Sequence, residues 1–161
     1  MLRKLTASIA VVAVVAVAGC GGGSNSSGGG GGAEAQSAAS GDIPDNQVFL
    51  VHTGPGYSVK YPEGWTKKGT GRNLTFSDKD NSIHLVVTTR NPPVKVTGGR
   101  AKIELRRLGP PDPVTGKRPL LLIDRYVYAK GGRYAVLDLA TPKGVDNVDA
   151  YRLISNSFRW R

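Results

Sequence analysis

The pattern of apolar and polar positions along the chain predicts a protein built mainly from antiparallel β-hairpins. Two runs, 73–77 and 82–89, alternate apolar with polar residues and flank the turn sequence Asp78-Lys79-Asp80-Asn81. A period of two is typical of a strand with one buried face, and a short polar link between two such runs predicts a hairpin. The apolar positions of these runs are Leu74, Phe76, Ile83, Leu85 and Val87.

A second hairpin is predicted near the end of the chain. The strongly apolar runs 119–129 and 133–140 are joined by Lys130-Gly131-Gly132, a link whose glycines suit a tight turn. Two further strands, at 47–53 and 57–61, precede the first hairpin. A short extended piece is expected to begin at Trp65, followed by a polar turn over 68–71.

The middle of the chain carries a weaker pattern. We expect two short strands within 95–107, with Gly98-Gly99 as the turn between them, but a short helix at 101–108 also fits. The segment 109–117 holds three prolines and Thr115-Gly116, so it is expected to be an exposed loop.

The last part of the chain changes to a helical period. Val148, Tyr151, Ile154 and Phe158 recur at helical spacing, and Asp146-Asn147-Val148-Asp149 offers side chains that could cap a helix. We therefore expect a helix from about 147 to 157 that packs this stripe on the sheet, with Trp160 closing its end. Hairpins followed by a separate helix predict an α+β fold, an antiparallel β-sheet with a C-terminal helix packed on one face.

The first residues have the pattern of an export signal. Arg3 and Lys4 precede the charge-free apolar run 5–17, and small residues follow it. This run is shorter than the roughly 20 residues that a membrane-spanning helix needs. Arg3-Lys4 is not a twin arginine, so we expect the general secretory route.

The sequence Val17-Ala18-Gly19-Cys20 resembles the lipobox of bacterial lipoproteins. The resemblance implies cleavage before Cys20, a diacylglyceryl thioether on its sulfur, and anchorage to the outer face of the bacterial cell membrane. Cys20 is the single cysteine, so no internal disulfide can form. We expect three parts: a signal peptide (1–19), the lipidated cysteine with a flexible Gly/Ser-rich tether (20–41), and a folded domain (42–161).

Two stretches of the folded domain resemble PsbP-like lipoprotein domains. One is Gly56-Tyr57-Ser58-Val59-Lys60-Tyr61-Pro62-Glu63-Gly64-Trp65, and the other runs from Asp146-Asn147-Val148-Asp149 to Ser157-Phe158-Arg159-Trp160. The resemblance covers 47–161 and implies the PsbP/Mog1 fold, an antiparallel sheet flanked by helices. It also implies an accessory or binding role, with no named ligand.

The formal net charge of +10 does not point to nucleic acid, because the basic residues are scattered in pairs at most. Charge of this kind favours solubility and contact with anionic surfaces. Some of these cations could together contact an anionic lipid or cell-wall polymer. The sequence candidates for such contacts are Arg106, Arg107, Lys117, Arg118 and Arg125.

The residues needed for catalysis are sparse. The two histidines, His52 and His84, fall in predicted strands without a recognisable partner, and no metal-ligand set, cofactor motif or nucleophile motif is present. We expect a non-catalytic module that binds an unknown protein or small ligand near the membrane. The alternatives are an electrostatic adaptor and, less favoured, an envelope hydrolase, for which Glu63, Glu104 and His84 would have to share one cleft. Asp138 is expected to pair across strands with Arg125 or Arg133.

Overall fold

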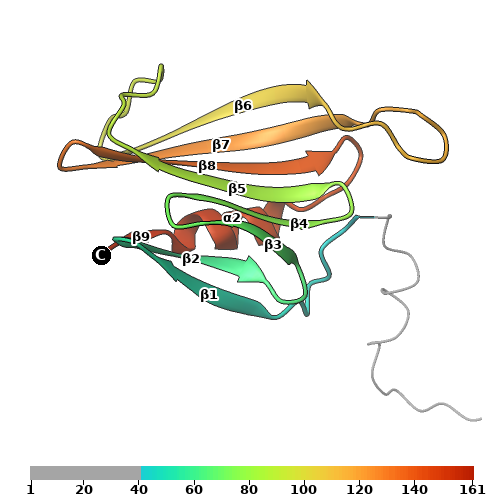
Figure 1. The fold of residues 1–161 in the computed structure, drawn as a ribbon, viewed down its shortest axis with the longest axis horizontal. Coiled ribbons are helices and arrows are strands. Elements are labelled where there is room, and N and C mark those ends of the chain that lie inside the picture. Colours follow the sequence, from blue (N-terminus) through green and yellow to red (C-terminus); the bar gives the residue numbers. More distant parts are fainter. Residues whose placement is uncertain (1–40) are drawn as a thin grey trace, which may run out of the picture. The chain divides into compact units, whose positions relative to one another are not determined.

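The computed structural model describes residues 41–161, which form nine strands and one helix (Figure 1). Their order along the chain is β1 (Phe49–Gly54), β2 (Tyr57–Pro62), β3 (Thr66–Thr70), β4 (Asn73–Asp78), β5 (Asn81–Thr88), β6 (Arg100–Leu108), β7 (Leu120–Lys130), β8 (Arg133–Pro142), α2 (Val148–Ser157) and β9 (Arg159–Trp160).

The strands form two antiparallel sheets. Six of them lie in the order β3-β4-β5-β8-β7-β6, and the other three lie in the order β1-β2-β9. The predicted hairpins are both present, as β4–β5 and β7–β8. An antiparallel sheet followed by a C-terminal helix confirms the predicted α+β class.

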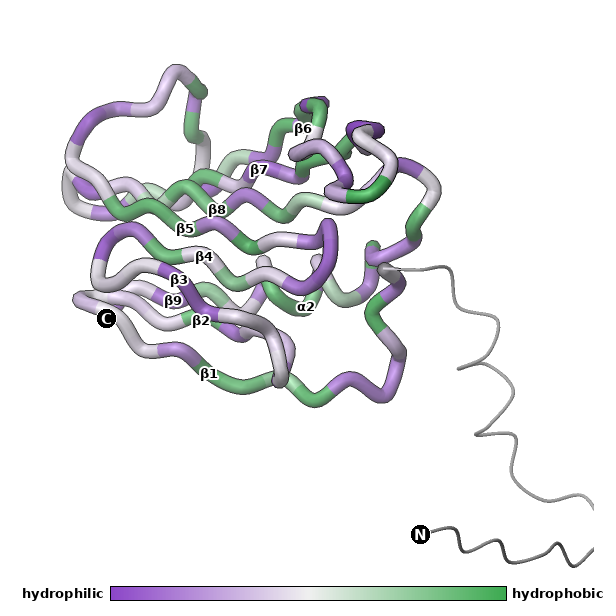
Figure 2. Tube along the Cα trace, turned by 45° about the vertical axis from the view of Figure 1, so that its right-hand side comes forward, coloured by the Kyte–Doolittle hydropathy of each residue, from purple (hydrophilic) through white to green (hydrophobic). Residues whose placement is uncertain are grey.

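The core lies between the large sheet, the small sheet and α2. Buried and part-buried residues alternate along β5 and through the middle of β8, and both strands run through the centre of the large sheet (Figure 2). Each of these two strands therefore gives an apolar row to this core. The fully buried side chains include Phe76 of β4, Ile83 and Leu85 of β5, and Leu137 and Leu139 of β8. Registers such as Leu85 opposite Leu137 place these rows side by side, which explains why the apolar face is continuous.

The helix packs on this face largely as its periodicity predicts. Tyr151, Ile154 and Phe158 are buried, and the Tyr151 hydroxyl donates to the Ala140 carbonyl at 2.6 Å. Trp160 contacts Phe158 edge-on, with ring centroids 5.2 Å apart. The prediction was wrong for Val148, which is 61% exposed at the start of the helix.

The predicted capping role was also wrong for Asn147, whose side chain makes no cap hydrogen bond. It lies instead in a buried polar cluster formed by Asn81, Thr141, Asn147 and the backbone of Gly41 and Ile43. This cluster fixes the beginning of the described segment to β5, to β8 and to the start of the helix.

The middle of the chain departs most from its prediction. A single long strand, β6, replaces the two short strands expected within 95–107, and the alternative helix at 101–108 is not formed. Gly98 and Gly99 precede this strand rather than divide it, and Thr97 bridges to Arg100. The strand β3 runs through the expected polar turn and ends at Thr70, because its register with β4 accommodates Gly69 at a φ of 81°.

Candidate functional site

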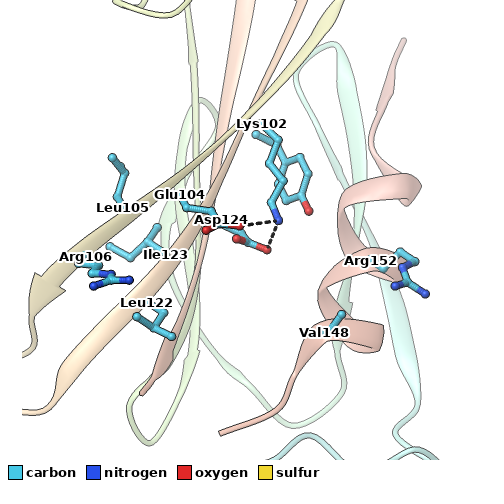
Figure 3. Close-up of a pocket in the computed structure, with 10 residues that line it drawn as sticks. Lys102, Glu104, Leu105, Arg106, Leu122, Ile123, Asp124, Val148 and Arg152 are labelled. Atoms are coloured by element: carbon cyan, nitrogen blue, oxygen red, sulfur yellow. Dashed lines mark ion pairs between the residues drawn. The ribbon is translucent and has the colours of Figure 1, made fainter. Parts of the chain in front are cut away.

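A groove of about 500 Å³ opens where β6 and β7 extend beside α2. Its volume is within the range of small-molecule sites. Figure 3 shows the residues from both walls: the strands supply most of them, and the helix supplies Val148 and Arg152. The strand residues are Lys102, Glu104, Leu105, Arg106, Leu122, Ile123, Asp124 and Tyr126.

The charged centre of the groove is Lys102. Its ammonium group lies 3.0 Å from a carboxylate oxygen of Asp124 and 3.6 Å from one of Glu104 (Figure 3). The register explains the cluster, because Glu104 faces Asp124 directly and Lys102 faces Tyr126 on the same side of the sheet. The hydrogen bond that Lys102 donates to the Asp124 carboxylate raises the pKa of Lys102, so the ammonium stays charged.

Cations and apolar side chains share the remaining surface. Arg106 lines the strand wall, and Arg152 lies on the helix, where it pairs with Asp149 at 3.2 Å. Val148 is exposed on the helix wall and Leu122 is half-buried on the sheet wall. This arrangement suits a ligand that joins an anionic group to an apolar part.

The described lining of the groove contains no serine, threonine, cysteine or histidine. The three residues that a hydrolase would have needed together lie apart. Glu104 lines the groove, Glu63 follows the end of β2, and His84 lies on the opposite face of the sheet, 3.0 Å from Asn73. The residues described by the structure also contain no group of three His, Cys, Asp or Glu able to hold a metal ion.

The other histidine, His52, contacts the rings of Tyr57 and Phe76. Its Nε2 is buried and has no hydrogen-bond partner within 41–161. Burial, and then the positive charge of Lys67, lowers the pKa of His52. These surroundings favour the neutral ring and offer no carboxylate to orient it.

The five sequence candidates for anionic contacts do not form one continuous face. Arg106 lines the groove, and its neighbour Arg107 points to the other face of β6 because successive strand residues alternate. Arg125 is held by Asp138 through bonds of 2.6 and 2.7 Å, which confirms the expected cross-strand pair and raises the pKa of the guanidinium. Lys117 and Arg118 lie in the β6–β7 loop, where Arg118 donates to the Gly109 carbonyl. Their role toward an anionic partner stays a prediction.

The groove itself was missed by the sequence reasoning. Its signal is the pattern Lys102-x-Glu104-x-Arg106 facing Leu122-x-Asp124-x-Tyr126, which places charges on the face that the core would otherwise occupy. Recognising it requires the register of β6 with β7. Cys20 and the residues assigned to the signal and tether lie outside the described segment, and within that segment no helix is long and apolar enough to cross a membrane.

Comparisons with known proteins bear on the fold. Neither a protein-family model nor a curated protein sequence matches the chain. A crystal structure from Bacteroides thetaiotaomicron VPI-5482 matches with a TM-score of 0.50 and 12% identity, over 70% of this chain and 48% of that one. The chain thus spans about half the length of that protein.

The solved structures with a similar fold also include cyanobacterial PsbP (CyanoP) from Synechocystis sp. PCC 6803, in a solution structure. The TM-score is 0.42 at 15% identity, over 75% of this chain and 98% of that one. These likenesses concern the path of the backbone alone.

Proposed function

We propose that this chain is a membrane-anchored bacterial lipoprotein with a non-catalytic binding domain, and that the groove between β6, β7 and α2 holds its ligand. The groove carries the proposal, because it joins cationic and apolar surface in a volume suited to a small molecule. The lipobox-like sequence around Cys20 supports the anchorage. Two acyl chains would hold the protein stably on a bilayer, whereas one chain would not.

The ligand class follows from the walls. The Lys102 ammonium forms ion pairs with Asp124 and Glu104, so it lines the groove but offers little uncompensated charge to a ligand. Arg106 makes no ion pair within the described segment and is the natural contact for a carboxylate or phosphate group of the ligand. Val148 and Leu122 would cover the apolar part of the ligand.

The groove is tested by filling it. Val148→Trp adds a ring to an exposed helix position that faces the groove, and Val114→Trp adds the same ring to a loop residue that is 90% exposed. Native mass spectrometry of protein taken directly from membranes should detect a small molecule on the unaltered chain and on Val114→Trp. The small molecule should be missing from Val148→Trp. A ligand retained by Val148→Trp would contradict the assignment of the groove.

Anchorage has its own measurement. Intact mass spectrometry of the native protein should find a chain that begins at Cys20 and carries acyl mass. A Cys20→Ser chain should leave the membrane fraction. An unprocessed amino terminus or an unmodified thiol would refute the lipoprotein assignment and leave the groove to be judged separately.

A further inference from the structure

One end of the six-stranded sheet carries a row of basic residues. Five of its six strands each bring one cation to this end. In sheet order, they are Arg72 before β4, Arg90 after β5, Arg133 at the start of β8, Lys130 at the end of β7 and Arg100 at the start of β6. These five residues are called the basic end.

Backbone contacts place the five residues side by side. Val87 donates to the Arg72 carbonyl, Thr88 is opposite Tyr134, Lys130 is opposite Arg133, and Arg100 is opposite Tyr128. Neighbouring strands lie about 4.8 Å apart, so five strands span about 20 Å. The cations therefore form a line rather than a single pocket.

Acidic residues are missing from the segments that form this end. The stretches 64–77, 82–103, 125–137 and 150–161 contain no aspartate or glutamate. Several acidic residues instead lie in turns at the opposite end, among them Asp78 and Asp80 between β4 and β5 and Asp112 between β6 and β7. In Figure 1 the β7–β8 turn and β9 lie at one end, and the β4–β5 turn and β6–β7 loop lie at the other.

The basic end is partly held in place by aromatic rings and by the helix. The Arg133 guanidinium lies 4.9 Å from the Trp160 ring centre, and that of Arg100 lies 4.7 Å from the Tyr126 ring centre. Arg100 also donates to Asn156 and Ser155 near the end of α2. None of the ion pairs formed within 41–161 includes a residue of the basic end. Five neighbouring cations without counter-charges repel one another, and a polyanion would relieve that repulsion.

We propose that the basic end binds a linear, phosphate-bearing polymer. A row of cations matches a chain of repeated charges better than it matches one compact anion. The tether is expected to join the domain at Gly41, which the polar cluster fixes beside Asn81 and the β4–β5 turn, at the opposite end of the strands. A domain anchored there has its attachment point and its basic end at opposite ends of the strands, so the basic end is free to face away from its own bilayer. The choice of a polymer over a lipid surface therefore rests on the proposed anchorage at Cys20.

The test removes the positive charge of three exposed side chains of the basic end. Arg72→Gln/Arg90→Gln/Lys130→Gln changes exposed residues of the basic end. The matched control, Lys79→Gln/Lys117→Gln/Lys143→Gln, removes three exposed lysines from turns of the opposite end. Binding of inorganic polyphosphate to the native protein in a non-ionic detergent is measured between 50 and 200 mM salt (roughly the range over which counterion release is resolved). Matching urea unfolding curves establish that both triple variants fold.

The expected loss follows from counterion release. Each phosphate contact contributes about −0.7 to the slope of log K against log salt on a single-stranded polyanion, so five contacts give about −3.5. Removing three should reduce the slope to about −1.4 and weaken binding about 100-fold near 0.1 M salt. The control should weaken binding only about twofold, through the long-range field.

Three results would overturn the proposal. Equal losses in both triple variants would mean that net charge alone drives binding. Competition by inorganic phosphate at equal phosphate concentration would mean that the row does not require a polymer.

In nanodiscs, the anchored protein should bind polyphosphate whether the lipid is phosphatidylcholine alone or includes phosphatidylglycerol. Loss of binding in the anionic discs would show that the basic end lies on its own bilayer. Failure to enter discs counts instead against anchorage, and the detergent titration does not depend on it.

Discussion

The buried polar cluster makes a strong prediction about Asn147. This side chain is 3% exposed, and its Oδ1 accepts a hydrogen bond from the Ile43 amide at 2.7 Å. Its Nδ2 lies 3.0 Å from Thr141 Oγ1, 3.2 Å from Asn81 Oδ1 and 3.3 Å from the Gly41 carbonyl. The amide nitrogen has only two hydrogens, so two of these three acceptors can be served at once, which gives three hydrogen bonds in total.

Asn147→Ala removes all three bonds. At about 1 kcal/mol net for each bond, the free energy of unfolding should fall by about 3 kcal/mol. The carbonyl of Gly41 keeps its bond from Asn81, and Asn81 keeps its bond from Thr141, so few groups lose every partner. The half-buried Ile43 amide can donate to water once Asn147 is removed. The loss of unfolding free energy should therefore stay below the cost of leaving a fully buried amide without an acceptor.

Urea unfolding followed by tryptophan fluorescence measures this loss. A change of about 3 kcal/mol corresponds to a fall in Tm of about 12 °C for a domain of this size. Asn91→Ala, at an exposed position, is the control and should change stability by less than about 0.5 kcal/mol. Amide exchange adds a local readout, because the Ile43 amide should lose its protection. A loss under about 1 kcal/mol with Ile43 still protected would refute the claim that the cluster fixes this segment.

Two further predictions concern ionisable groups. Arg125→Met leaves Asp138, whose side chain is 14% exposed, without its ion-pair partner. The unfolding free energy should therefore fall by about 2 kcal/mol, between the values for exposed and buried pairs. Adding Asp138→Leu should recover most of this loss, which a double-mutant cycle measures. The lowered pKa of His52 means that the unfolded chain binds a proton first as pH falls through 6.5, so unfolding free energy should decrease below pH 7 by at most about 1.4 kcal/mol per pH unit. His52→Gln should flatten this slope, and an unchanged slope in this variant would refute the assignment.

The hairpins could be predicted from sequence because their alternation and their turns agree. Leu74, Phe76, Ile83 and Leu85 each fall on the buried face that a period of two assigns to them. The sequence predicted an extended piece from Trp65 but not the continuation of β3 through 68–70, because all five residues of this strand are exposed and no apolar alternation marks an edge of this kind. Local pattern thus locates elements that bury a face and overlooks those held mainly by backbone pairing.

The sites required information that local pattern does not contain. The groove depends on Glu104 standing opposite Asp124, which the β6–β7 register decides. The basic end depends on turns and strand ends far apart in sequence meeting at one side of the sheet. Its trace in the sequence is the absence of acidic residues between 82 and 103, which becomes meaningful once the strand order is known. The helix was predicted with nearly its observed bounds, and only the capping role of Asn147 was wrong, because a side chain suited to capping serves equally well in a buried network.

The long strand β6 leaves one side of its backbone without a partner strand in the six-stranded sheet. Such an edge could recruit the same strand from a second molecule. If two copies met in the antiparallel register centred on Glu104, Glu104 would face its own copy and each Lys102 would face an Arg106. Like charges would then oppose each other at three successive pairs along that face, which disfavours the ladder. The charged residues that line the groove would thereby disfavour pairing of β6 strands between neighbouring copies of the protein.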